Sequence, residues 1–117
     1  MSEPAPEGLS VAGSALWDAV LGPFELEDHE RALLLQACRC ADLLEVLEAA
    51  IAEGGPLLAD GKVRPAVVEL RLQRITFARL MAALRVPLGD EDEQSVARPQ
   101  RRSGVRGVYG LPDGRAS

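Results

Sequence analysis

The chain has 117 residues, of which 47% are hydrophobic but only 3% aromatic, and its formal net charge at pH 7 is −5. This length allows one compact domain, and the acidic balance argues against a protein that coats nucleic acid over its whole surface. The only cysteines, Cys38 and Cys40, would point about 200° apart on a helix and cannot bridge each other, which excludes a disulfide scaffold.

Both ends of the chain have the composition of flexible tails. Residues 1–10 carry two prolines and two glutamates with almost nothing apolar, and residues 90–117 begin with four acidic residues and continue with five arginines and four glycines. We therefore predict a flexible N-terminal tail at 1–10, a helical oligomerisation domain at 11–89, and a flexible acidic-then-basic tail at 90–117. A core of this size supplies only about 3–5 kcal/mol by itself, which favours oligomerisation.

The first predicted helix is short. It begins at Val11 or Ser14, so that it lies at about 14–21, and Gly22-Pro23 ends it. The connection that follows is semi-apolar, and we expect it to pack beneath the next helix.

The second predicted helix, at 28–53, is the clearest element of the pattern. Asp28 and Glu30 lie in its first turn, where acids favour the positive end of the helix dipole, and Gly54-Gly55 ends it. Its apolar residues step alternately by 4 and 3, which is typical of a packing seam. With Leu34, Ala41 and Leu43 they form a stripe too broad for one partner helix. The seam consists of Leu33, Ala37, Cys40, Leu44, Leu47 and Ile51.

A hairpin loop at 56–64 and a third helix at 65–85 complete the predicted domain. Asp60-Gly61 is a strong tight-turn signal, and Pro65 suits the first position of a helix. The fold class is therefore mainly all-α: an antiparallel helical hairpin with a short N-terminal helix and a small β-hairpin or extended loop between the long helices. The third helix has one apolar line and further apolar residues that periodicity places on the same buried side: Leu70, Phe77, Met81 and Leu84, then Val68, Leu72, Ile75 and Leu80.

Catalytic and metal-binding patterns are absent from the sequence. The single histidine, His29, lies among acids at a predicted helix start, where a surface role is expected, and no serine has a plausible histidine partner. We therefore predict no enzyme activity, no cofactor and no metal site. With no signal peptide and no apolar segment of membrane-spanning length, we expect a cytoplasmic protein that does not contact membranes.

Arginines are the strongest candidates for binding. Arg71 and Arg74 share a line on the third helix, with Arg64 shortly before it. Either they form an ordinary solvated face, or they meet phosphates or the acidic groups of the preceding helix in a neighbouring subunit. The tail arginines could form a phosphate-binding arm or a docking peptide: Arg98, Arg101, Arg102 and Arg106.

In order along the chain, these features resemble the small terminase subunits of tailed double-stranded-DNA bacteriophages, in the branch common in actinobacterial phages and prophages. The resemblance covers about Leu16 to Gly110 and rests on the ordered set of features, since no single motif is specific. The set comprises Leu16-Trp17, Phe24-Glu25-Leu26, the acidic helix start, Gly54-Gly55, Asp60-Gly61, Arg64-Pro65, Leu84-Arg85-Val86-Pro87 and Arg101-Arg102-Ser103-Gly104-Val105-Arg106-Gly107-Val108-Tyr109-Gly110.

The resemblance implies a non-catalytic homo-oligomeric ring that recognises viral double-stranded DNA and delivers it to the large terminase subunit, an ATPase and nuclease, in the cytoplasm of the bacterial host. The arginines named above would then contact DNA or the large subunit. The alternative is a helical-hairpin adaptor or antitoxin-like module that binds a protein partner and no DNA. In the ring hypothesis, the residues expected to hold subunits together are Leu33, Leu44, Leu47, Ile51, Phe77 and Met81.

Overall fold

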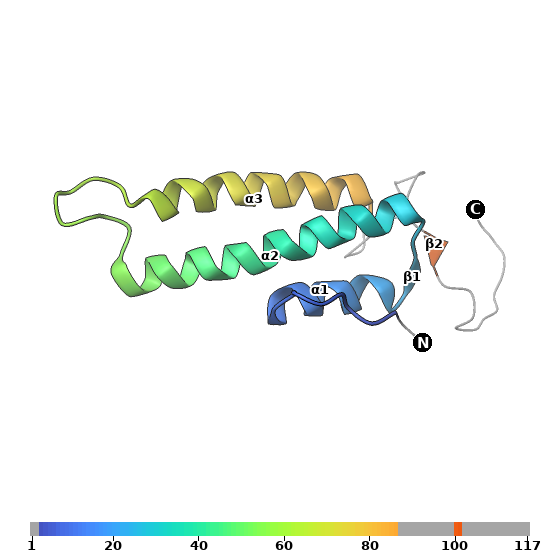
Figure 1. Cartoon of the computed structure of the whole chain (residues 1–117). Coiled ribbons are helices and arrows are strands. Elements are labelled where there is room, and N and C mark those ends of the chain that lie inside the picture. Colours follow the sequence, from blue (N-terminus) through green and yellow to red (C-terminus); the bar gives the residue numbers. More distant parts are fainter. Residues whose placement is uncertain (1–2, 87–99, 102–117) are drawn as a thin grey trace.

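The computed structural model describes residues 3–86 and 100–101. It contains three helices, α1 (Val11–Leu21), α2 (Asp28–Gly54) and α3 (Pro65–Leu84), and the short strands β1 (Phe24–Glu25) and β2 (Gln100–Arg101). Figure 1 shows α2 in the middle, with α3 antiparallel along one side of it and α1 against the other. The predicted fold class, a mainly all-α antiparallel hairpin with a short N-terminal helix, is confirmed.

Local sequence accounts for both ends of α2. At its start, Glu27 and Glu30 form a reciprocal capping box, in which the Glu27 backbone N–H donates to Glu30 Oε1 at 2.7 Å. At its end, Gly55 has a φ of 81°, and its N–H donates to the Ile51 carbonyl at 2.6 Å. A residue with a Cβ is strained in that conformation, so a glycine is needed where the chain leaves the helix.

The connection between α2 and α3 is a minimal β-hairpin. A single antiparallel bridge joins Leu57 to Val63, and the Leu58 N–H donates to the Lys62 carbonyl at 2.7 Å. Gly61 has a φ of 87°, as the Asp60-Gly61 turn signal predicts. Of the two alternatives for residues 56–64, the structure therefore has the small β-hairpin.

The buried core lies at the end of the molecule that contains α1. It joins α1, the β1 connection, the first part of α2 and the last residue of α3. Each large side chain buried there contributes about 1.5–3 kcal/mol relative to exposure. The cluster consists of Trp17, Val20, Leu21, Phe24, Leu26, Leu34, Cys38 and Leu84.

Residues 3–10 differ from the flexible tail that their composition predicts. The Trp17 indole Nε1 donates to the Glu3 carbonyl at 3.1 Å, and Ala5 and Leu9 pack against the core. A buried indole needs an acceptor, and this segment supplies one together with two apolar side chains. The segment is therefore part of the domain.

Part of the C-terminal region that is predicted as a flexible tail forms a strand that pairs with β1. β2 pairs antiparallel with β1, so that Phe24 lies opposite Arg101 and Glu25 opposite Gln100. The rest of that predicted tail lies outside the described residues.

A carboxylate on α2 caps the start of α1. Asp42 Oδ2 accepts the Ser10 N–H and Asp42 Oδ1 accepts the Gly13 N–H, each at 2.7 Å. Helix α1 comes so close that a Cβ on Gly13 would lie 2.7 Å from the Cys38 carbonyl oxygen. The sequence alone places Asp42 on the solvated side of α2, because periodicity does not show where a second helix will start. Asp42 thus fixes both the start of α1 and its position on α2.

Replacing Asp42 by alanine should therefore lower the free energy of unfolding by about 1–2 kcal/mol, because two N–H groups at the start of α1 lose their acceptor. Chemical denaturation followed by Trp17 fluorescence would measure the change. Glu45→Ala, measured like Asp42→Ala at a concentration where subunits are dissociated, is the matched control, since the exposed Glu45 lies one turn further along α2. Equal stability of the two variants would contradict the capping role.

Candidate assembly and nucleic-acid interface

Among the described residues, no third helix lies over the half of the hairpin that carries the loop (Figure 1). We call this part, residues 43–76, the distal half. In α2 every buried residue precedes it, the last being Cys40, and within the distal half of α3 only Leu70 is buried. Two helices in contact each bury one stripe and leave the other sides to solvent. The distal half therefore keeps much of its apolar surface accessible.

The six residues predicted to join subunits are all half-buried within the single chain. Leu33 and Met81 pack against the core cluster. The others lie in the distal half or at its edge, and those on α2 share their side of the helix with Cys40, whose Sγ lies 3.4 Å from the Gln73 carbonyl of α3. The seam residues of α2 therefore face α3 of the same chain. The four predicted residues that do not pack against the core cluster are Leu44, Leu47, Ile51 and Phe77.

The exposed apolar residues of the two long helices are different ones. Val68, Leu72 and Ile75, which periodicity alone places on the buried side of α3, are 42%, 48% and 45% exposed, and that expectation is wrong. We call them the α3 stripe. Helix α3 is apolar around much of its circumference, so its pattern does not decide which side meets α2. On α2, the exposed Leu43, Val46 and Ala50 form the α2 stripe.

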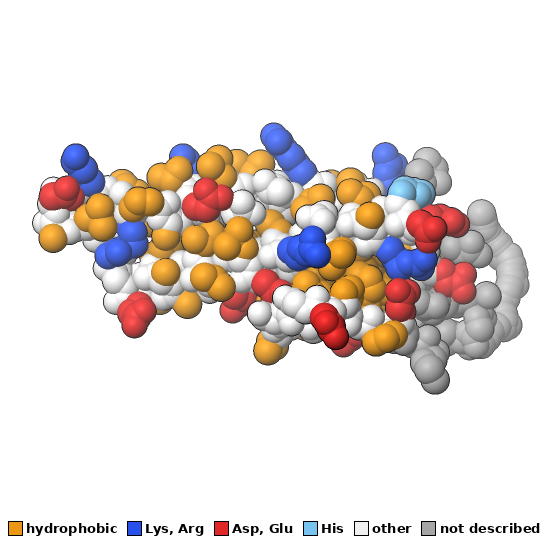
Figure 2. Space-filling model, in the orientation of Figure 1, with side chains coloured by type: hydrophobic (Ala, Val, Ile, Leu, Met, Phe, Trp, Pro, Cys, Tyr) orange, Lys and Arg blue, Asp and Glu red, His pale blue; other side chains and the backbone are white. Residues whose placement is uncertain are grey.

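Figure 2 shows apolar side chains spread over both long helices and the loop of the distal half. At the loop, Leu57, Leu58 and Val63 are exposed as well. Exposed apolar side chains gathered on one part of a small domain mark a candidate interaction site. This surface is the best candidate for assembly.

Arg64, a predicted DNA or partner contact, is used within the chain. Its Nε donates to the Gly55 carbonyl and its Nη2 to the Gly54 carbonyl, both at 2.8 Å. The guanidinium thus satisfies carbonyl groups at the C-terminus of α2, where a positive charge is also favoured by the helix dipole. Arg64 therefore caps the C-terminus of α2 within the chain.

Arg71 and Arg74 differ in their ion-pair contacts. Arg74 Nη2 lies 3.0 Å from Glu48 Oε2. This is the predicted contact with an acid of the preceding helix, but it forms within one chain, and as an exposed pair it contributes little to stability. Arg71 is exposed and has no ion-pair partner among the described residues.

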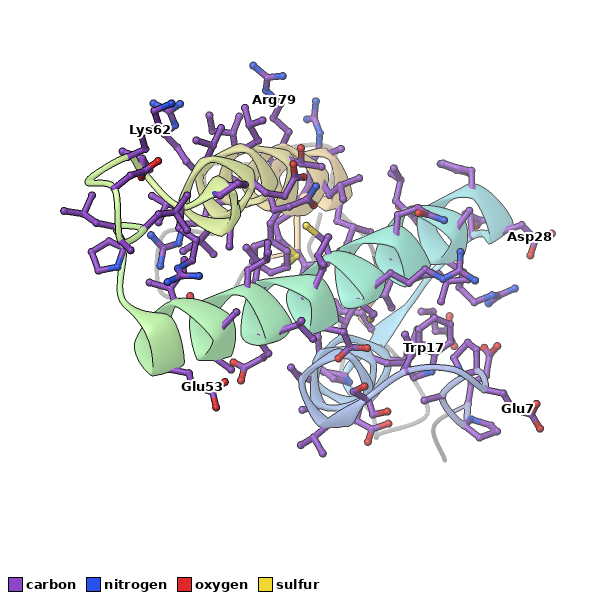
Figure 3. The ribbon with its side chains drawn as sticks, turned by 60° about the vertical axis from the view of Figure 1, so that its left-hand side comes forward. Glu7, Trp17, Asp28, Glu53, Lys62 and Arg79 are labelled. Carbon is purple, nitrogen blue, oxygen red and sulfur yellow. The ribbon has the colours of Figure 1, made fainter. Side chains whose placement is uncertain are left out.

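Arg79 was missed as a candidate from the sequence. It is exposed, has no ion-pair partner in the described part of the chain, and extends away from α3 on the side opposite α2 (Figure 3). It follows Ile75 by four residues and so continues the α3 stripe. That spacing was the signal that could have identified it.

Among the predicted tail contacts, only Arg101 lies within the described residues, in β2. Arg98, Arg102 and Arg106 lie outside them.

Both cysteines are buried. Burial, with the nearby carboxylates of Asp42 and Asp18 as lesser causes, raises the pKa of Cys38 to about 11, and burial also raises the pKa of Cys40. At neutral pH both are protonated thiols, the unreactive form. They serve as packing residues.

Other kinds of site are not found in the described residues. They contain no cluster of three or more histidine, cysteine or acidic side chains that could hold a metal ion. His29 is exposed at the start of α2. No helix of residues 3–86 is long and apolar enough to cross a membrane.

Comparison of the chain with models of protein families, with curated proteins and with solved structures gave no match.

Replacing Arg64 by alanine should lower the free energy of unfolding by about 1 kcal/mol, because two charge-assisted hydrogen bonds to α2 carbonyl groups are removed. Arg71→Ala, at an exposed side chain without an ion-pair partner in the described residues, should leave stability unchanged at a concentration where subunits are dissociated. Urea unfolding of both variants would measure this. An Arg64→Ala variant as stable as the wild type would make Arg64 a binding candidate again.

Proposed function

We propose that this chain is a small terminase subunit: a non-catalytic factor that forms a homo-oligomeric ring, recognises viral double-stranded DNA and delivers it to the large terminase subunit for genome packaging in the host cytoplasm. The observation that carries the proposal is the exposed apolar surface of the distal half, on a hairpin whose own core lies at the other end. Such a surface is stabilised when copies cover it. The ordered resemblance along the sequence supplies the packaging role.

In this proposal, the distribution of charge separates the residues that contact phosphates from those that contact proteins. Residues 1–62 hold twelve acidic residues against three basic ones, whereas residues 94–117 hold five arginines against one aspartate. Arg64 and Arg74 are engaged within the chain. The C-terminal arginines are therefore the better candidates for phosphate contacts, and Arg71 and Arg79 for contacts between proteins.

Assembly is the first prediction of this function. Sedimentation of the intact chain at micromolar concentration should give a mass several times that of the 12.5 kDa monomer, because the distal half gains burial only from neighbours. A folded monomer at that concentration would contradict the ring.

DNA binding is the second prediction. Filter binding of double-stranded DNA should weaken steeply as salt rises. Replacing Arg98, Arg101, Arg102 and Arg106 by glutamine should reduce that slope by about 0.9 for each phosphate that is no longer neutralised. Arg74→Gln is the control, since its guanidinium already pairs with Glu48, and it should leave the slope unchanged.

The alternative, an adaptor that binds one protein and no DNA, is favoured by the exposed acids at the end of the molecule near β1, which include Glu25, Glu27 and Asp28. An intact oligomer with no DNA affinity, together with tight binding to a single protein, would support the adaptor and contradict the terminase.

A further inference from the structure

The α3 stripe and the α2 stripe lie on different sides of one hairpin and do not meet within a chain. Arg79, which continues the α3 stripe, extends from the side of α3 opposite α2 (Figure 3). The α2 stripe lies beside the seam that faces α3, and Glu48, which pairs with Arg74, lies on the other side of that seam. Each chain therefore carries two separate exposed apolar stripes.

The two stripes match in length. Leu43 and Ala50 are seven residues apart with Val46 between them, and Val68 and Ile75 are seven residues apart with Leu72 between them. Each stripe therefore spans about 10 Å along its helix, and both have the alternating spacing of 3 and 4 that lets two helices pack side by side. In shape, one stripe fits the other.

The charges along one edge of each stripe have opposite signs. Arg71 lies along one edge of the α3 stripe and Arg79 at its end, and neither has an ion-pair partner among the described residues. Beside the α2 stripe lies the exposed Glu53, which follows Ala50 by three residues and extends from the side of α2 away from α3 (Figure 3). The exposed Arg39 lies one turn before Leu43, at the other end of this stripe. Charges at the edges of a helix pair select the partner.

The same charges disfavour a contact between two identical stripes. Two α3 stripes packed antiparallel would bring Arg71 against Arg71 of the second copy, and two α2 stripes would bring their acidic edges together. An α3 stripe packed antiparallel on an α2 stripe instead places the edge with Arg71 beside the edge with Glu53. With Leu72 level with Ala50, a shift of one turn from full overlap of the two stripes, Arg71 comes within one turn of Glu53.

We propose that the α3 stripe of one subunit packs antiparallel on the α2 stripe of the next. This inference rests on the proposed function, because it specifies how the ring is built. Two different surfaces meet at every contact, so the interface is head-to-tail and adds subunits until the ring closes. Each subunit then covers the exposed stripes of both neighbours.

Two variants that each block one stripe test this arrangement. Leu72→Asp blocks the α3 stripe and Val46→Asp blocks the α2 stripe. Each variant alone should sediment as a monomer over a concentration series, because one of the two required surfaces is missing. A 1:1 mixture should form a heterodimer of about twice the 12.5 kDa subunit mass and nothing larger, since each variant retains the surface that the other lacks.

Val11→Asp is the matched control, because Val11 is an apolar residue of α1 that is 87% exposed and lies outside both stripes. It should keep the wild-type mass, and circular dichroism with Trp17 fluorescence should show all three variants folded. A Val46→Asp variant that assembles alone, or two monomeric variants that form no heterodimer, would overturn the pairing and leave the proposed function standing. A monomeric wild-type chain would overturn the proposed function itself.

A charge exchange tests the antiparallel register. Arg71→Glu should reduce the mass of the assembly at fixed concentration, and adding Glu53→Arg in the same chain should restore it. Restoration by Glu53→Arg supports the proposed edge-to-edge contact, and a double variant no larger than the single one would overturn it.

Discussion

The difference in length between α1 and α2 determines most of what this molecule can do. Helix α1 has 11 residues and α2 has 27, about 16 Å against about 40 Å. Asp42 fixes the start of α1 near the middle of α2, so the buried core cannot extend past that point. Beyond it, two helices and a small hairpin hold more apolar surface than they can cover. The same chain thus has a buried core at one end and exposed apolar surface at the other.

The arginines show how the structure separates roles that look alike in the sequence. Arg64 completes the C-terminus of α2, and Arg74 pairs with Glu48 across the hairpin, so both act within the subunit. Arg71 and Arg79 border the α3 stripe without ion-pair partners in the described residues. A cation beside exposed apolar surface selects an acidic partner more than it adds affinity. The proposed function therefore places assembly and DNA binding in different parts of the chain.

The architecture was largely predictable because its signals are local: Gly54-Gly55 and Pro65 mark helix ends, Asp60-Gly61 marks the turn, and the alternating seam marks the packed side of α2. The sequence could not show that Asp42 caps another helix, since that contact joins residues about 30 positions apart. The periodicity of the sequence also placed the α3 stripe on the buried side of the helix, which is wrong. A helix that is apolar on several sides has no single preferred face, and only the position of its neighbours decides which side is buried.

We expect neighbouring subunits to cover the exposed apolar surface of the distal half. Hydrogen exchange measured at two protein concentrations tests this most directly. When the concentration rises through the range in which subunits associate, amides in residues 43–54 and 65–76 should exchange more slowly, because covered helices open less often. Amides of α1 and the first turns of α2, which have their own core, should change little. Equal exchange in the distal half at both concentrations, while the measured mass increases, would contradict completion of this half by neighbours.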